Sequence, residues 1–281
     1  MAEAAPRLSI VIVTYNSRAY VGACLDALAQ YSPPHRHEIL VVDNASPDGT
    51  GAAIRNARSD VRVIDAGANL GFARANNLGI RASTGELILL LNPDATVTAE
   101  AVGRLVAALD VRSDAAIAGP RLLDPSGRVE LSFGSMLSPW AECRQKLLLR
   151  GYERGWGPVA AYVRGLTRRP QDVDWVSGAC LLVRRADAEA VGLMDERYFM
   201  YAEDVDFCAA VRGRGRRVIF VPSAEVVHLR GQSRATAAAA TNVAYRRSHI
   251  AFYEKHHPGW ARLLRLYLKV RGELPDSPIR E

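Results

Sequence analysis

Short apolar runs alternate with segments of helical periodicity through the first half of the chain. Residues 8–15, 38–42, 61–64 and 87–91 have the length and composition of buried strands. Between them, apolar residues recur at three- and four-residue spacing, first at Val21, Cys24, Leu25 and Leu28 and later at Val102, Leu105, Val106 and Leu109. This alternation predicts an α/β fold with a mostly parallel sheet and helices on both faces.

The second half of the chain has a less regular pattern. Residues 137–169 are rich in Arg, Gly and Trp and show no clear period, so we expect an irregular, mobile excursion there. Residues 174–185 and 218–221 are strand-like again. Residues 245–271 are typical of a helix that breaks at the Pro258–Gly259 pair. The pattern thus predicts one α/β domain with a helical extension at its C-terminal end.

The central apolar run ends in an unusual way, in the string LILLLNPDA at residues 87–95. Pro93 cannot donate to a sheet, so the strand must stop there. Asn92 and Asp94 are then delivered to the carboxyl end of a central strand, which is where open α/β sheets bind ligands. A carboxylate at that edge could hold a divalent cation against a diphosphate. A solvated turn is the alternative.

Polar residues also follow the first two predicted strands. Thr14, Tyr15 and Asn16 come after the first, and Asp43 and Asn44 come after the second. Because parallel strands end at one edge of a sheet, we expect these side chains to lie near Asn92 and Asp94. A carboxylate such as Asp43 can accept from a pyrimidine ring N–H or from ribose hydroxyls. A helix or turn cap is its alternative role.

Composition narrows the class of protein. The 281 residues are 49% hydrophobic and carry a net charge of +6, which permits an anionic partner. The four cysteines lack CxxC spacing, so we expect reduced thiols. We find no signal peptide and no apolar run near the roughly 20 residues that span a bilayer. We therefore expect a cytoplasmic protein, or one that touches the inner face of the cell membrane only at its surface.

Two stretches concentrate the positive charge. One lies within residues 144–169, and the other, residues 261–271, interleaves leucines with basic side chains. The second pattern is typical of a basic amphipathic helix that lies on an anionic leaflet, although an ordinary packed helix fits it equally well. No known nucleic-acid-binding motif accompanies the charge, so a nucleic acid is not an expected partner.

Seven strings along the chain together resemble the family 2 glycosyltransferases. They are TYNS (14–17), VVDNAS (41–46), NLGFARANNLGI (69–80), LLLNPDA (89–95), DWVSGACLLVRR (174–185), YFMYAEDVDFC (198–208) and VVHLRGQS (226–233). The chain is most similar to the rhamnosyltransferase-like branch of that family, over residues 7–255. The resemblance implies a GT-A fold at residues 1–235, with a nucleotide-binding half at about 7–110 and an acceptor-binding half at about 111–235. Residues 236–281 would form the helical extension.

The resemblance also implies a donor site. Its residues would be Thr14, Tyr15, Asn16, Asp43, Asn44, Asn69, Arg74, Asn92, Asp94 and Gly178. Asp43 matches the carboxylate that reads the pyrimidine ring, and Asn69 and Arg74 match positions that close over the ribose and diphosphate. Arg230 and Arg234 would clamp the diphosphate, with a solvated basic loop as the alternative.

A divalent cation, Mn²⁺ or Mg²⁺, is the cofactor that the resemblance implies. Asp94 matches the last carboxylate of the family's DxD motif, and His228 matches a histidine that completes the metal site. Asn92 departs from the family pattern, which has an acid there. The site therefore has one negative charge fewer, and this change affects both the affinity for a metal and the preference among metals.

The catalytic base implied by the resemblance is Asp204, in the ED pair that it forms with Glu203. A positioned carboxylate can take the proton of an attacking hydroxyl. A purely structural acidic cluster that caps a helix from residue 205 is the alternative, and we assign Asp206 to that capping role. Trp175, Asp195 and Glu203 would lie near the sugar or the acceptor, although Trp175 could equally be a core residue.

These observations lead to one expected function and two alternatives. We expect an inverting, metal-dependent glycosyltransferase that moves L-rhamnose from dTDP-L-rhamnose to a cell-surface polysaccharide or polyprenyl-linked glycan. A UDP-hexose donor, or a non-catalytic nucleotide-sugar binding protein, would fit the same motifs. A nucleotide-sugar dehydrogenase or epimerase does not fit, because the first strand is followed by TYNSRAY and not by a GxGxxG turn.

Overall fold

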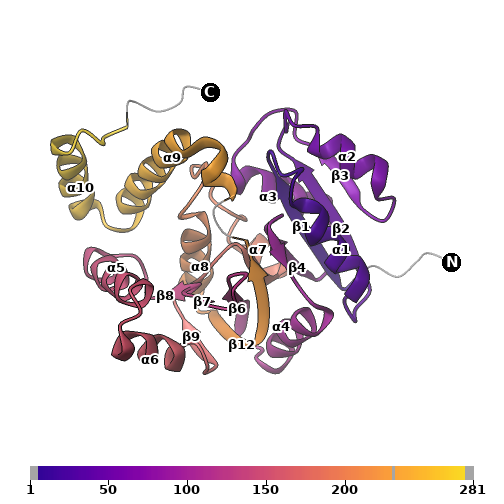
Figure 1. Ribbon diagram of the computed structural model, residues 1–281, viewed down its shortest axis with the longest axis horizontal. Helices are drawn as coiled ribbons and strands as arrows, with labels where there is room; N and C mark the ends of the chain where they lie inside the picture. Colours follow the sequence, from indigo (N-terminus) through magenta and orange to yellow (C-terminus); the bar gives the residue numbers. More distant parts are fainter. Residues whose placement is uncertain (1–5, 230–231, 276–281) are drawn as a thin grey trace.

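A mixed sheet forms the centre of the computed structural model, which describes residues 6–229 and 232–275. Its path runs β3-β2-β1-β4-β11-β6-β12-β5, with β7 and β9 attached to β6 and β12 (Figure 1). The strands are β1 (Leu8–Thr14), β2 (His37–Asp43), β3 (Arg62–Asp65), β4 (Leu87–Leu91), β5 (Ala95–Thr96), β6 (Ala115–Leu123), β7 (Val129–Glu130), β9 (Gln171–Val173), β11 (Cys180–Arg184) and β12 (Arg217–His228). A separate two-stranded sheet pairs β8 (Phe133–Gly134) with β10 (Trp175–Val176).

The sheet is largely parallel, as the sequence predicts. Strands β3, β2, β1 and β4 are parallel, and β6 pairs with β12 in parallel. Strand β11 is antiparallel to both of its neighbours, β4 and β6. It therefore joins the first half of the sheet to the second, and its first residue, Cys180, lies opposite Leu91 at the carboxyl end of β4.

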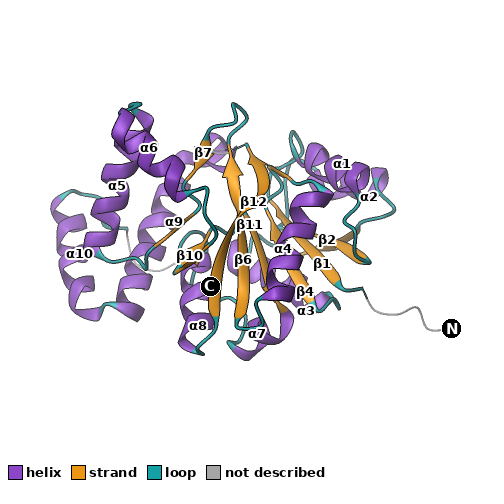
Figure 2. Ribbon diagram, turned by 90° about the horizontal axis from the view of Figure 1, so that it is seen from below, coloured by secondary structure: helices purple, strands orange, loops and turns teal. Residues whose placement is uncertain are grey.

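Helices cover both faces of the sheet because the strand residues alternate between two cores. Leu87, Leu89 and Leu91 pack with α1, α2 and α4, whereas Ile88 and Leu90 pack with α3, α8 and α9. These helices are α1 (Val21–Tyr31), α2 (Thr50–Ala57), α3 (Phe72–Ala82), α4 (Ala99–Val111), α8 (Glu203–Gly213) and α9 (Gln232–His256), and α7 (Arg185–Ala190) follows β11. Figure 2 shows the strands surrounded by these helices.

The expectation of an irregular excursion at residues 137–169 is wrong. The segment forms two helices, α5 (Pro139–Glu153) and α6 (Gly157–Leu166). Ser138 caps α5 by accepting the Ala141 N–H at 3.3 Å, and Pro139 occupies the first turn. Gly151 is the buried residue of α5 and Val163 that of α6, so neither helix carries the wide apolar stripe that makes a helix visible in a sequence.

The C-terminal helices and the last long strand differ from the expectation only in extent. The break at Pro258 is confirmed, because α10 (Pro258–Val270) starts there. Helix α9 begins earlier than expected, at Gln232. Strand β12 continues past Val221 to His228 through an irregularity in its register. The division of the chain at residue 235 stays a prediction.

Among the described residues, none of the helices has both the length and the apolar character needed to span a membrane.

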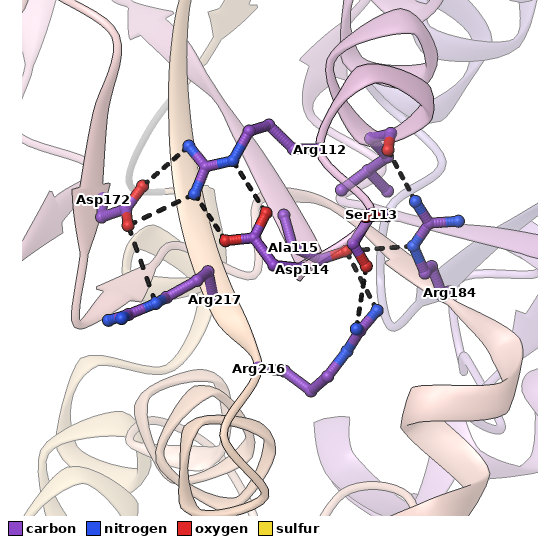
Figure 3. Close-up of polar contacts among 9 residues, drawn as sticks. Arg112, Ser113, Asp114, Ala115, Asp172, Arg184, Arg216 and Arg217 are labelled. Carbon is purple, nitrogen blue, oxygen red and sulfur yellow. Dashed lines mark hydrogen bonds and ion pairs between the residues drawn. The ribbon is translucent and has the colours of Figure 1, made fainter.

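A network of arginine ion pairs and hydrogen bonds connects the segments at the edge of the sheet where β6 and β12 begin (Figure 3). Arg112 pairs with Asp114 at 2.8 Å and with Asp172 at 3.2 Å, and so links the end of α4 to β9. Arg184 and Arg216 donate to the Ala115 carbonyl oxygen at 3.0 and 3.4 Å. Since β4 and β6 run in the same direction, this network lies at the edge opposite the carboxyl ends of the strands.

Candidate active site

The ends of β1 and β2 bring their polar residues together, as the parallel pairing predicts. Thr14 lies opposite Asp43, and its Oγ1 donates to Asp43 Oδ1 at 3.2 Å. Ser46 donates to the same oxygen at 2.5 Å. Gly51 lets α2 approach, because a Cβ there would lie 2.5 Å from Asp43 Oδ2. Asp43 is therefore fixed at the sheet edge, with its carboxylate accepting from hydroxyl groups.

Asn44 connects the end of β2 to the loop before α3. Its Nδ2 donates to Asn69 Oδ1 and to the Gly71 carbonyl oxygen, each at 3.1 Å, and its Oδ1 accepts from the Leu70 N–H at 2.9 Å. All hydrogen-bonding groups of this amide are used within the protein. Asn44 thus positions Asn69 in the site.

Tyr15 and Asn16 form the turn after β1. Tyr15 is exposed. Asn16 adopts a left-handed conformation with φ of 53°, and its backbone N–H donates to Ser46 Oγ at 3.1 Å. Asn16 Oδ1 is buried and has no partner among the described residues. A buried amide oxygen without a hydrogen-bond partner is unfavourable. A bound ligand that donates a hydrogen bond to Asn16 Oδ1 would remove this cost.

Asp94 and His228 meet where β5 pairs with the end of β12. His228 Nε2 lies 3.3 Å from Asp94 Oδ1, and His228 Nδ1 lies 3.3 Å from Glu130 Oε2. Burial lowers the pKa of His228, but its hydrogen bonds to the two carboxylates outweigh burial and raise that pKa to about 9. Asn92 Oδ1, also buried, has no hydrogen-bond partner in the described part of the chain.

Oxygen and nitrogen ligands for a cation are thus available at this point. Within residues 6–229 and 232–275, no group of three or more His, Cys, Asp or Glu side chains is arranged to hold a metal ion. Asn92, Asp94 and His228 instead offer an amide oxygen, a carboxylate and an imidazole. With the ring proton of His228 released on binding, this donor set suits a divalent cation that takes its other ligands from a diphosphate.

Asp204 lies at the start of α8, next to Gly178 in the segment just before β11. Its Oδ2 accepts from the Gly178 N–H at 2.9 Å and its Oδ1 accepts from the Val205 N–H at 2.8 Å. Burial raises the pKa of Asp204, and these backbone hydrogen bonds act in the opposite direction. The carboxylate is therefore held in a fixed orientation by two backbone donors.

Glu203 is more deeply buried than its neighbour. Burial and the charge of Asp204 raise the pKa of Glu203 well above its usual range. Its Oε2 has no partner among the described residues. Tyr201 and Ala202, which lead into the helix, both adopt left-handed conformations, with φ of 72° and 67°. Such consecutive non-glycine residues cost free energy, and they place the ED pair at the helix N-terminus.

The loop at residues 69–71, before α3, and the segment before Asp204 are in direct contact. The Phe72 N–H donates to the Phe199 carbonyl oxygen at 2.6 Å. Gly71 has a φ of 79°, and a Cβ there would lie 2.4 Å from the same oxygen. Gly178 packs between the two regions, since a Cβ there would lie 3.4 Å from both Asp204 Cβ and Phe72 Cε1. These contacts join the loop before α3 to the N-terminus of α8.

Three expected site residues lie in mainly structural surroundings. Trp175 is buried in the core and donates from Nε1 to the Ser135 carbonyl oxygen at 2.9 Å. Asp195 pairs with Arg197 at 2.8 Å and with Lys255 at 2.9 Å. Arg74 lies 3.6 Å from Glu196, at the rim of the site.

Asp206 does not cap α8 as expected. Its carboxylate contacts Tyr198, Lys255 and His256 at 3.2, 2.8 and 2.7 Å, and so joins α8 to the end of α9.

Arg230 lies outside the described residues, and so does the side chain of Arg234. Sequence reasoning missed Glu130, because it belongs to a two-residue strand without any pattern of its own.

The comparison with protein families decides the class of protein. The model of glycosyl transferase family 2 matches residues 9–192. The chain belongs to glycosyl transferase family 2. It is therefore a glycosyltransferase, and its architecture is the GT-A fold of that family.

Relatives of similar length agree with this assignment. The chain is 32% identical to the N-acetylglucosaminyl-diphospho-decaprenol L-rhamnosyltransferase of Mycobacterium tuberculosis, over 98% of this chain and 96% of that protein. It is 28% identical to the dTDP-rhamnosyl transferase RfbF of Shigella flexneri, over 79% of this chain and 68% of that protein. The rhamnosyltransferase WbbL of Escherichia coli is 23% identical, over 78% of this chain and 82% of that protein.

Solved structures of low sequence identity share the fold. The mannosyltransferase PcManGT of Pyrobaculum calidifontis, in complex with GDP-Man and Mn²⁺, superposes with a TM-score of 0.62 at 19% identity. The match covers 97% of this chain and 73% of that one. TarS of S. aureus, in complex with UDP, superposes with a TM-score of 0.58 at 15% identity, over 95% of this chain and 78% of that one.

Proposed function

We propose that this protein is an inverting glycosyltransferase that moves L-rhamnose from dTDP-L-rhamnose to a hydroxyl group of a lipid-linked glycan. The names of the rhamnosyltransferases among its relatives support the sugar and the lipid-linked acceptor. The observation that carries the proposal is the position of Asp204. The Gly178 N–H donates to Asp204. Nearby, Asn44 at the end of β2 donates to the Gly71 carbonyl oxygen and so holds the loop before α3. In this proposal, the catalytic base and the nucleotide site share one edge of the sheet.

Asp204 acts as the general base in this proposal. Its carboxylate takes the proton of the acceptor hydroxyl while that oxygen attacks the anomeric carbon, and the bond to the nucleoside diphosphate breaks. Base catalysis of this kind contributes about 10²–10⁴-fold to a rate. Burial and the charge of Asp204 raise the pKa of Glu203 well above its usual range, which disfavours a second negative charge beside Asp204.

The residues around Asp94 fit a divalent cation, Mn²⁺ or Mg²⁺. Asp94, His228 and the unpartnered Oδ1 of Asn92 would hold it. A bound cation would neutralise the charge that develops on the departing diphosphate. The imidazole suits Mn²⁺ better than Mg²⁺, because Mg²⁺ prefers oxygen ligands.

The nucleotide would lie across Thr14, Tyr15, Asn16 and Asp43. Asp43 would accept from the pyrimidine ring N–H, which thymine and uracil share, so a UDP-hexose is the alternative donor. Asn69 and Arg74 would close over the ribose and diphosphate. A non-catalytic nucleotide-sugar binding protein is the alternative of a different class, and it would have no use for a positioned base at Asp204.

We place the protein in the cytoplasm, in peripheral contact with the inner face of the cell membrane. Helix α10 supports this placement, because it carries exposed apolar side chains beside basic ones. The apolar side chains are Trp260, Leu263, Leu266, Tyr267 and Val270. Such a helix binds an anionic leaflet through both its apolar area and its charge.

Calorimetric titration with dTDP-rhamnose, UDP-glucose and GDP-mannose, with and without Mn²⁺, tests the donor and the metal together. We expect dTDP-rhamnose to bind in a Mn²⁺-dependent way, and Asp94→Ala to abolish the metal dependence. Asp204→Asn is the matched control, since it should bind the donor but fail to transfer rhamnose to a lipid-linked acceptor. Transfer at an undiminished rate by Asp204→Asn would overturn the assignment of the base.

A further inference from the structure

A surface cavity of about 470 Å³ lies between α5 and α6, away from the proposed nucleotide site. It is lined by Arg144, Leu147, Leu148, Arg150, Gly151, Arg154, Trp156 and Val159. Five of these residues are exposed, so the cavity opens to the surface. Gly151 allows the two helices to meet at its base, because a Cβ there would lie 3.1 Å from Val159. The cavity combines an apolar floor with three guanidinium groups.

The arginines at this cavity have few partners within the protein. Arg144 donates to Ser135 Oγ at 3.1 Å. In the part of the chain that the structure describes, neither Arg150 nor Arg154 forms an ion pair with an acidic side chain. Arg112 and Arg216, by contrast, pair with aspartates at 2.8 and 2.9 Å. Guanidinium groups bind phosphate strongly, and three of them around one cavity favour an anionic ligand.

Large apolar side chains project into solvent beside these charges. Trp140, Leu147, Trp156 and Tyr162 are 81%, 61%, 56% and 51% exposed. Tryptophan and tyrosine are enriched where one end of a side chain is apolar and the other is wet, as at a membrane surface. Together with arginine they match the chemistry of a phospholipid, which has an anionic head and an apolar chain.

The cavity and α10 lie at the same end of the molecule. Figures 1 and 2 both place α5, α6 and α10 on the side away from α2 and β2. Side-chain contacts tie this end together: Glu142 of α5 lies 2.8 Å from His249 of α9, and His257, just before α10, lies 2.8 Å from the carbonyl oxygen of Leu137, just before α5. A membrane that contacts α10 could therefore also reach α5 and α6.

We propose that the cavity between α5 and α6 binds an anionic phospholipid of the membrane leaflet. Arg144, Arg150 and Arg154 hold the phosphate of its head group. An acyl chain lies against the apolar side chains of Leu147, Leu148 and Val159. This inference rests on the peripheral membrane contact of the proposed function, and it adds a defined lipid site to the contact of α10.

Charge reversal at the cavity, with a matched control nearby, tests the proposal. The test variant is Arg150→Glu with Arg154→Glu. The control is Arg168→Glu with Arg169→Glu, which makes the same change of charge at exposed positions just after α6. Binding to vesicles of phosphatidylcholine, with and without phosphatidylglycerol, is measured by flotation. A basic side chain near an anionic surface contributes about 1 kcal/mol, so the cavity variant should lose at least roughly tenfold in affinity for phosphatidylglycerol vesicles, and the control much less.

The thiol of Cys143 provides a second measurement. It is exposed on α5, whereas the other three cysteines are buried, so an environment-sensitive dye can be attached there selectively. We expect the dye emission to shift to shorter wavelength with phosphatidylglycerol vesicles in the wild type and in the control, and not in the cavity variant. No shift in the wild type would overturn the proposal.

Other outcomes separate this inference from the proposed function. Equal losses in the two variants would mean that net charge alone attracts the protein, and the lipid site would be rejected. Unchanged vesicle binding with a raised KM for the lipid-linked acceptor in detergent would assign the cavity to the acceptor diphosphate instead. Rhamnose transfer to a short-chain, water-soluble acceptor reports on the proposed function alone, and the cavity variant should keep that activity.

Discussion

Asp204 shows how opposing interactions can tune a single carboxylate. Burial raises its pKa, and the N–H groups of Gly178 and Val205 limit the rise by stabilising the charged form. The side chain is thus a stronger base than an exposed aspartate, whose pKa is about 3.9, and the two backbone donors favour its ionised form. This balance suits a group that must accept a proton near neutral pH.

The pH dependence of turnover follows from the raised pKa of Asp204. A carboxylate acts as a base only when ionised, so kcat should fall as the pH decreases through that pKa, at a pH above the ordinary value of about 3.9. A pH profile of kcat at saturating donor measures this. Glu203→Gln is the control, and it should leave the acidic limb in place, because the limb is assigned to ionisation of Asp204 and the raised pKa of Glu203 favours its neutral form. An acidic limb that disappears in Glu203→Gln would contradict the assignment.

Gly71 is a position where any side chain should disrupt the site. Its left-handed conformation and the nearby Phe199 carbonyl oxygen both oppose a Cβ. Gly71→Ala should lower the free energy of unfolding by about 1–3 kcal/mol and also lower kcat/KM for the donor. Gly67→Ala is matched to it, because Gly67 has a similar φ of 72° but open space around it. The difference between the two variants, measured by urea unfolding and by kinetics, isolates the close approach to Phe199. Equal effects would show that only the backbone conformation matters.

At the scale of elements, a buried carboxylate fixes α9 against α8. Asp206 is almost completely buried and accepts from Tyr198, Lys255 and His256. Removing one member of a buried charge pair leaves the other without compensation. Asp206→Asn should therefore lower the free energy of unfolding by roughly 2–4 kcal/mol, as measured by urea unfolding. Asp195→Asn removes a more exposed partner of the same Lys255, and its effect should be clearly smaller. A larger effect from Asp195→Asn would place the fastening of α9 elsewhere.

The elements that could be predicted are those with buried, regular patterns. Strand β4 and its neighbours were predictable because they are apolar along their whole length, and their parallel order brings Thr14 beside Asp43. Helices α5 and α6 were not predictable, since their exposed surfaces impose no apolar period. The second half of β12 was also missed, because Pro222 ends the continuous apolar run and is typical of a strand end. Glu130 reaches His228 through tertiary packing alone, which no local pattern encodes.

At the scale of the whole molecule, the antiparallel strand β11 brings the two halves to one site. It lies between β4, which ends at the proposed cation site, and β6, which is paired with β12. Its approach carries Gly178 to Asp204, and the Ala179 carbonyl oxygen accepts from the Asn92 N–H at 2.9 Å. A shift of either half relative to the other would therefore disturb the base and the cation site together.

The proposed membrane contact has an apolar component in α10 and an electrostatic component at the cavity between α5 and α6, and these should respond differently to salt. Leu263→Ser with Leu266→Ser removes exposed apolar area from α10, so binding should weaken on neutral and anionic vesicles alike. Added salt should weaken only the binding to anionic vesicles, because screening acts on charge. Val111→Ser, at an exposed position of α4, is the control and should change neither. Flotation across a salt series separates the two components. Unchanged binding of the α10 variant to neutral and anionic vesicles would show that the apolar face of α10 does not contribute to membrane contact.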